Sequence, residues 1–131
     1  MTIFHSRTAW RLAVTLIAAA AAFYAPGQAG EADIVKAEVQ RSSDGTYSFD
    51  VTVSHADEGW VHYADAFEIL TLDGEILDTR VLLHPHENEQ PFTRSLTGVG
   101  VDTGLTEVRA RAHDNVHGYG GVELVVELPS R

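Results

Sequence analysis

Hydrophobic and polar residues alternate along most of the chain after residue 30, with the period of two that is typical of β-strands burying one face. The clearest example is the segment 47–54, in which Tyr47, Phe49, Val51 and Val53 alternate with polar residues. Turn residues such as Asp73-Gly74 separate such segments. The strands expected from this pattern are 34–40, 47–54, 62–72, 76–83, 92–97, 106–113 and 122–128.

Seven short strands in one domain predict an all-β fold, namely a seven-stranded antiparallel immunoglobulin-like β-sandwich. The segment 108–115, which is followed by Gly118, Gly120 and Gly121, resembles the sixth strand and next loop of fibronectin type III domains. The tyrosine common at the start of that strand is missing, since Val108 holds the nearest position. The resemblance implies a fold and no function, because this architecture carries many unrelated roles.

Residues 1–29 have the features of an export signal that forms an apolar helix. Arg7 and Arg11 precede an apolar run at 12–25, and small residues follow up to Ala29, where we expect cleavage. A helix over the run would span roughly 21 Å against about 30 Å for a bilayer core. We therefore predict a periplasmic or secreted domain at 30–131 with no stable membrane span; an uncleaved N-terminal anchor is the alternative.

The composition narrows the possible ligands. Two of the nine Lys and Arg residues and none of the nineteen Asp and Glu residues precede Gly30, so the remainder has a formal charge of −12. This acidic charge disfavours binding to nucleic acid or an anionic membrane. The sequence has no cysteine, and Met1 is its one methionine. Without soft sulfur ligands, Zn(II) or Cu(II) is favoured over Cu(I).

The segment 80–96 reads RVLLHPHENEQPFTRSL and contains a His84-Pro85-His86 tripeptide. It resembles the signature of an uncharacterised family of small exported bacterial proteins with an HPHxNEQPFTRSL-like segment. The resemblance implies export and transfers no activity to this chain.

Six of the seven histidines fall in three short stretches, at His55 with His62, His84 with His86, and His113 with His117. In the predicted sandwich the second, fourth and sixth strands all run toward the same end of the molecule. The three histidine stretches follow these strands and therefore lie together at that end. Strand alternation further predicts that Val108, Ala110 and Ala112 face the core. It also predicts an outer face with Glu68 between Arg80 and Arg109, below a row formed by His84, His62 and His113.

Neutral imidazoles brought together commonly hold a transition metal. The predicted metal ligands are His62, His84, His86 and His113, with His117 as a possible replacement. Asp114, Glu87 or Glu89 would be a carboxylate ligand or an acceptor for a ring N–H. His55 taken alone is typical of a structural histidine, and the alternative for the whole group is a hydrogen-bonded polar end without metal.

Two functions follow from these observations. The first is an exported protein that binds Zn(II) or Cu(II) at a histidine-rich end, as a carrier, sensor or accessory factor. The alternative is a non-enzymatic envelope module in which aromatic residues such as Trp60 contact another protein, although Trp60 could instead cap the core above Phe67 and Phe92. No catalytic signature is present, so catalysis by a metal-bound water is a third and weaker hypothesis.

Overall fold

The computed structural model describes residues 30–130, and the predicted signal segment lies outside them. Seven strands follow one another along the chain. They are β1 (Asp33–Arg41), β2 (Tyr47–Ser54), β3 (Ala64–Leu70), β4 (Ile76–Val81), β5 (Phe92–Val99), β6 (Glu107–Asp114) and β7 (Leu124–Glu127).

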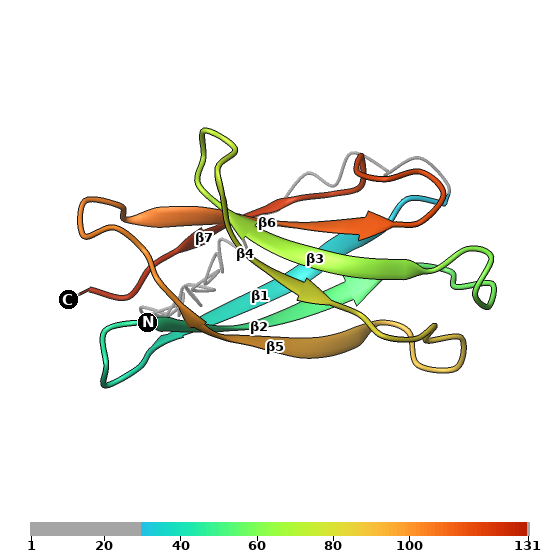
Figure 1. Cartoon of the computed structure of the whole chain (residues 1–131), viewed down its shortest axis with the longest axis horizontal. Helices are drawn as coiled ribbons and strands as arrows, with labels where there is room; N and C mark the ends of the chain where they lie inside the picture. The colour runs from blue at the N-terminus through green and yellow to red at the C-terminus, as the bar shows by residue number, and fades with distance from the viewer. Residues whose placement is uncertain (1–29, 131) are drawn as a thin grey trace, which may run out of the picture.

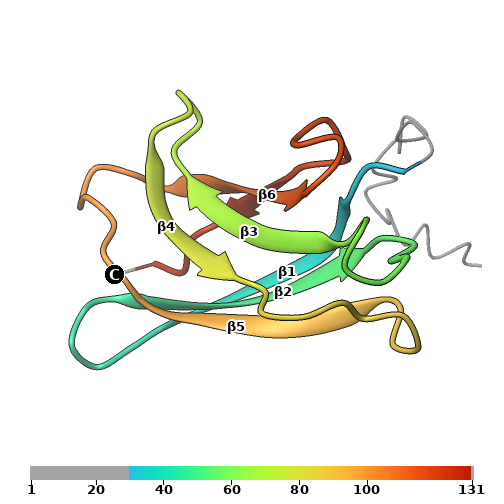
Figure 2. The same ribbon diagram turned by 45° about the vertical axis from the view of Figure 1, so that its right-hand side comes forward.

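The strands form two layers (Figures 1 and 2). One sheet has the order β1-β2-β5 and the other β4-β3-β6-β7, and every pairing is antiparallel. The predicted all-β sandwich is confirmed, including the placement of β3 between β4 and β6. Within the described residues, no helix is long and apolar enough to cross a membrane.

The core lies between the two sheets and is built by the alternating positions. On β2 the apolar residues Tyr47, Phe49, Val51 and Val53 are buried while their neighbours are not. On β6 the expected inward residues Val108, Ala110 and Ala112 are buried, which confirms the predicted alternation of that strand.

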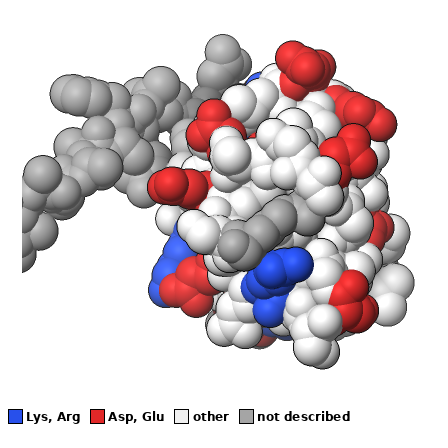
Figure 3. All heavy atoms as spheres, turned by 90° about the vertical axis from the view of Figure 1, so that its left-hand side faces the viewer, with Lys and Arg blue, Asp and Glu red and all other residues white. Residues whose placement is uncertain are grey.

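The three histidine stretches lie at one end of the sandwich, as the topology predicted. Because β3 runs antiparallel to both neighbours, its start lies beside the ends of β4 and β6, and Ala66 pairs with both Val81 and His113. The loops 55–63, 82–91 and 115–123 therefore gather at this end, on the right of Figure 1. We call it the histidine end. The opposite end shows Asp and Glu side chains spread over its surface with few Lys and Arg (Figure 3).

The predicted row of His84, His62 and His113 on the outer face is wrong for the residues expected on β3 and β4. The strand β3 begins at Ala64, so His62 lies in the preceding loop, and a register shift between Ala64 and Ala66 interrupts the alternation. Glu68 is buried and faces Arg111 across the β3–β6 pair in place of Arg109.

The outward orientation predicted for Leu82 and His84 after β4 is also wrong for Leu82. β4 ends at Val81, and Leu82, which shares its parity with Arg80 and His84, is buried in the core. His84 therefore follows a chain segment that turns inward. Trp60 is 64% exposed and does not cap the core, whereas Phe67 and Phe92 are buried in it.

Candidate metal centre

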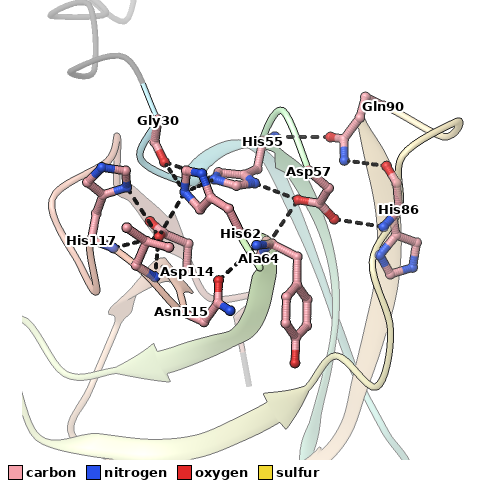
Figure 4. Close-up of polar contacts among 12 residues, drawn as sticks. Gly30, His55, Asp57, His62, Ala64, His86, Gln90, Asp114, Asn115 and His117 are labelled. Carbon is pink, nitrogen blue, oxygen red and sulfur yellow. Dashed lines mark hydrogen bonds and ion pairs between the residues drawn. The ribbon is translucent and has the colours of Figure 1, made fainter. Parts of the chain in front are cut away.

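His55, His62 and Asp114 form a compact group at the histidine end. Their ligand atoms all lie within 4.8 Å of one another. His55 is 4% exposed, the Asp114 side chain is fully buried, and His62 is partly buried. The Nε2 atoms of the two histidines are 3.1 Å apart, and Nε2 of His62 is 3.2 Å from Oδ1 of Asp114 (Figure 4).

A backbone oxygen completes this arrangement. The carbonyl oxygen of Gly30 lies 2.8 Å from Nε2 of His55 and 3.1 Å from Nε2 of His62. These three atoms form a nearly equilateral triangle, with Asp114 beside one corner. Ligands of a tetrahedral zinc ion with bonds of about 2.0–2.1 Å are about 3.3 Å apart. The observed spacing is therefore close to that of a metal-binding set.

Asp57 fixes the ring of His55. Its buried carboxylate bonds Nδ1 of His55 through Oδ1, which also accepts a hydrogen bond from the amide of Ala64. A carboxylate on one ring nitrogen of a histidine orients the other nitrogen toward a metal. Asp57 is thus placed to aim Nε2 of His55 into the group.

The Asp114 carboxylate is held at the end of β6 by the turn that follows it. Oδ1 accepts hydrogen bonds from the amides of Val116 and His117. Burial opposes ionisation of this carboxyl group, but the two amides and the nearby His117 and His55 rings outweigh it and lower its pKa. Asp114 is therefore an anion, and its buried Oδ2 atom has no hydrogen-bond partner.

Hydrogen bonds alone satisfy this group poorly. When neutral His55 donates from Nδ1 to Asp57, its Nε2 atom carries a lone pair that faces the Gly30 carbonyl. The Nε2 proton of His62 can then serve only one of its three neighbours. A cation at the centre, or protonation of His55, removes this excess of lone pairs.

His117 lies at the edge of the group. Its ring contacts that of His62 with centroids 4.8 Å apart, and its Nδ1 atom is 3.3 Å from Oδ1 of Asp114. Of the predicted ligands, the structure therefore brings His62 and His117 together.

His84 and His86 form a separate pair, with ring centroids 4.6 Å apart. His84 is exposed, while His86 is 6% exposed and stacks on Phe92 at 3.9 Å. Both ring nitrogens of His86 are buried without a hydrogen-bond partner. Burial lowers the pKa of His86, and Arg94 and His84 lower it further. The pair lines an open pocket of about 530 Å³ together with Trp60 and Glu87.

His113 projects from the outer face of β6, as predicted. Its Nδ1 atom bonds Asp65 at 2.5 Å, and its ring lies against Tyr119. Tyr119 in turn donates to Glu68, which also accepts from Arg111. These contacts give His113 a structural partner, and the structure does not bring His84, His86 or His113 into the group around His62. A site shared by all five predicted ligands stays a prediction.

Two members of the group were outside the predicted ligand set. His55 was interpreted as structural, and the Gly30 carbonyl has no sequence signal at all. The seven-residue separation of His55 and His62 within one interstrand loop was the available indication, because both rings then lie at the same sheet edge. Asp114, in contrast, was already among the possible carboxylate ligands.

The chain resembles a curated protein from Halomicrobium mukohataei that is described as "Putative lipoprotein". The two are 43% identical over 100 residues, which cover 76% of this chain and 49% of that protein. This chain thus spans about half the length of the curated relative it matches. No protein-family model and no solved structure matches the chain.

Proposed function

We propose that this chain is a small exported domain that binds Zn(II) or Cu(II) at its histidine end, as a carrier, sensor or accessory factor. The ion would be held by His55, His62 and Asp114, with the Gly30 carbonyl as a further ligand and His117 close enough to replace one of them. The main support for this proposal is that Nε2 of His55, Nε2 of His62 and the Gly30 carbonyl oxygen lie within 3.1 Å of one another.

Three further features support this proposal. The donors are imidazole nitrogens and oxygens, which suit Zn(II) and Cu(II). Asp57 supplies the outer carboxylate that histidine ligands commonly have. Asp114 is a buried anion with one oxygen unpartnered, so a cation would offset its desolvation.

The export part of the proposal has two sources. One is the predicted signal at residues 1–29, and the other is the description of the Halomicrobium mukohataei relative as a "Putative lipoprotein". We carry over from that description only a location outside the cytoplasm.

Thermal unfolding of the exported protein with Zn(II), Cu(II) or a chelator tests the proposal. A ligand that binds only the folded state at a concentration 100 times its Kd adds about 2.7 kcal/mol of stability. For a domain of this size, that raises Tm by roughly 10–20 °C. The variant His62→Ala should lose most of this rise, because His62 touches each of the other donors.

The comparison that controls this experiment is the same titration with Mg(II), which prefers oxygen ligands in octahedral geometry. Mg(II) should leave Tm unchanged. The proposal is wrong if neither Zn(II) nor Cu(II) raises Tm, or if His62→Ala keeps the full rise.

A second candidate function is contact with another envelope protein, and exposed apolar side chains at the histidine end favour it. Trp60, Val61 and Leu83 are 64%, 77% and 78% exposed, and they lie in loops at the histidine end. Under this candidate the metals leave Tm unchanged. Crosslinking in the exporting cells would then give a defined adduct that Trp60→Ser with Leu83→Ser abolishes.

A further inference from the structure

Gly30 is built into the metal-binding group through its backbone. Its carbonyl oxygen contacts both Nε2 atoms, and its α-carbon packs against the ring of His117 so closely that a Cβ atom would lie 2.7 Å from Cε1. Its φ of +105° lies in the region that favours glycine. Only glycine therefore fits this position without displacing His117.

The segment that follows Gly30 is fixed along the glycine-rich loop 118–121. The amide of Val122 donates to Asp33, and the amide of Ile34 donates to the carbonyl of Val122. A Cβ atom on Gly121 would overlap the carbonyl oxygen of Ala32. This close approach of two backbones determines where Gly30 lies.

The predicted cleavage site is the peptide bond directly before Gly30. Hydrolysis of the Ala29–Gly30 bond adds water across it, leaving a carboxylate on Ala29 and an amino group on Gly30. A peptide nitrogen has its lone pair delocalised into the carbonyl group and is a poor ligand. A free amino nitrogen has an available lone pair once it has lost its extra proton.

An amino nitrogen and a carbonyl oxygen of one glycine can bind the same ion, because the two atoms and the metal close a five-membered ring. The Gly30 carbonyl already lies beside both histidines. With the amine, the set becomes three nitrogens, the Gly30 oxygen and an oxygen of the neighbouring Asp114 carboxylate. Tetragonal sets of nitrogen and oxygen are typical of Cu(II) and Ni(II).

We propose that removal of residues 1–29 completes a Cu(II) site, in which the α-amino nitrogen and the carbonyl oxygen of Gly30 chelate the ion together with His55 and His62. This inference rests on the proposed function. It makes the exported, processed chain a better copper ligand than its precursor, so that tight copper binding begins only after export.

The experiment compares the exported protein with and without a blocked α-amine. Lys36 is the one lysine of the printed sequence and is exposed in an ion pair with Glu38, so Lys36→Arg leaves the α-amine as the single primary amine. The full chain carrying Lys36→Arg is exported, its first residue is determined by intact mass, and half of the sample is acetylated. Metal-free melting checks that both forms are folded.

Cu(II) affinity and electron paramagnetic resonance are then measured on both forms. We expect the product to begin at Gly30 and the number of coupled nitrogens to fall from three to two on acetylation. Loss of a direct ligand should weaken Cu(II) binding by at least the roughly tenfold that loss of an outer partner of a ligand already costs. Equal affinity and unchanged spectra, or a product that begins elsewhere, would overturn the inference while leaving the proposed function intact. Absence of Cu(II) and Zn(II) binding in the unblocked form would overturn both.

Discussion

The carboxylate of Asp57 accepts a 2.7 Å hydrogen bond from the backbone amide of His86 through Oδ2, while its Oδ1 atom holds His55. One buried side chain thus joins the loop that carries His55 and His62 to the loop that carries the His84–His86 pair. Gln90 makes a second connection, because it accepts from the amide of His55 and donates to the carbonyl of His86 (Figure 4).

Asp57→Asn should weaken metal binding without removing a ligand. The amide side chain cannot provide the negative charge that orients His55, and loss of such an outer partner typically costs 10- to 100-fold in affinity. Titration of Zn(II) and Cu(II) into the variant measures the change. A stability loss of about 1.5–3 kcal/mol is also expected, since hydrogen bonds to a charged group are replaced.

Asp65→Asn is the matched control for this prediction. Asp65 makes the same kind of contact with Nδ1 of His113, but on the outer face of the sheet. Its substitution should leave the metal affinity unchanged. Equal losses of metal affinity in Asp57→Asn and Asp65→Asn would mean that Asp57 does not orient a ligand of the ion.

The combined variant His84→Ala with His86→Phe separates the group around His62 from the five-histidine site that the sequence predicted. Phenylalanine keeps an aromatic ring on Phe92, so the stack seen for His86 is retained. We expect the rise in Tm caused by Zn(II) or Cu(II) to persist. Its disappearance in a folded variant would show that His84 or His86 binds the ion.

His86 should make the fold less stable as the pH falls. Burial, Arg94 and His84 lower its pKa in the folded state, so below pH 6.5 the unfolded chain takes up a proton that folded His86 resists. Stability associated with His86 is therefore complete above this pH and declines as the pH falls through it. Between pH 7.5 and pH 5, Tm should fall less in His86→Phe than in the unsubstituted protein.

His84→Ala controls for the loss of one histidine from this loop, because the side chain is exposed and its ring nitrogen bonds the backbone carbonyl of Pro85. Its Tm should keep most of the pH dependence of the unsubstituted protein, because burial and Arg94 still lower the pKa of His86 when His84 is absent. A pH dependence of His86→Phe equal to that of the unsubstituted protein would contradict the assignment to His86.

The sequence predicted the fold well because alternation and turn residues both report on local structure. On β2 and β6 the apolar residues at alternate positions, such as Phe49 and Ala110, are buried in the core. The alternation failed before Glu68, at the start of β3, and again at Leu82. A register shift in β3 and an inward turn after β4 depend on packing between sheets, which the local pattern does not contain.

For the candidate site, the sequence predicted which loops lie together but not which of their side chains are in contact. Topology placed three histidine stretches at one end, but the choice of partners depends on short-range contacts within the loops. His113 is held by Asp65 and Tyr119, whereas His62 faces His55. The Gly30 oxygen was not predictable, because a backbone atom becomes a ligand through the path of the chain and not through its side chain.

Gly121→Ala should disturb both the fold and the metal site, because the added Cβ atom would overlap the carbonyl oxygen of Ala32. Relieving that overlap moves the segment carrying Gly30, at a cost of about 1–3 kcal/mol typical of overpacking, and weakens metal binding. Gly104→Ala is the control, since nothing lies within 4 Å of its added Cβ atom. Thermal melts and Cu(II) titrations should show losses in the first variant alone. Unchanged copper affinity in a destabilised Gly121→Ala would mean that the Gly30 segment does not contribute to the ion's site.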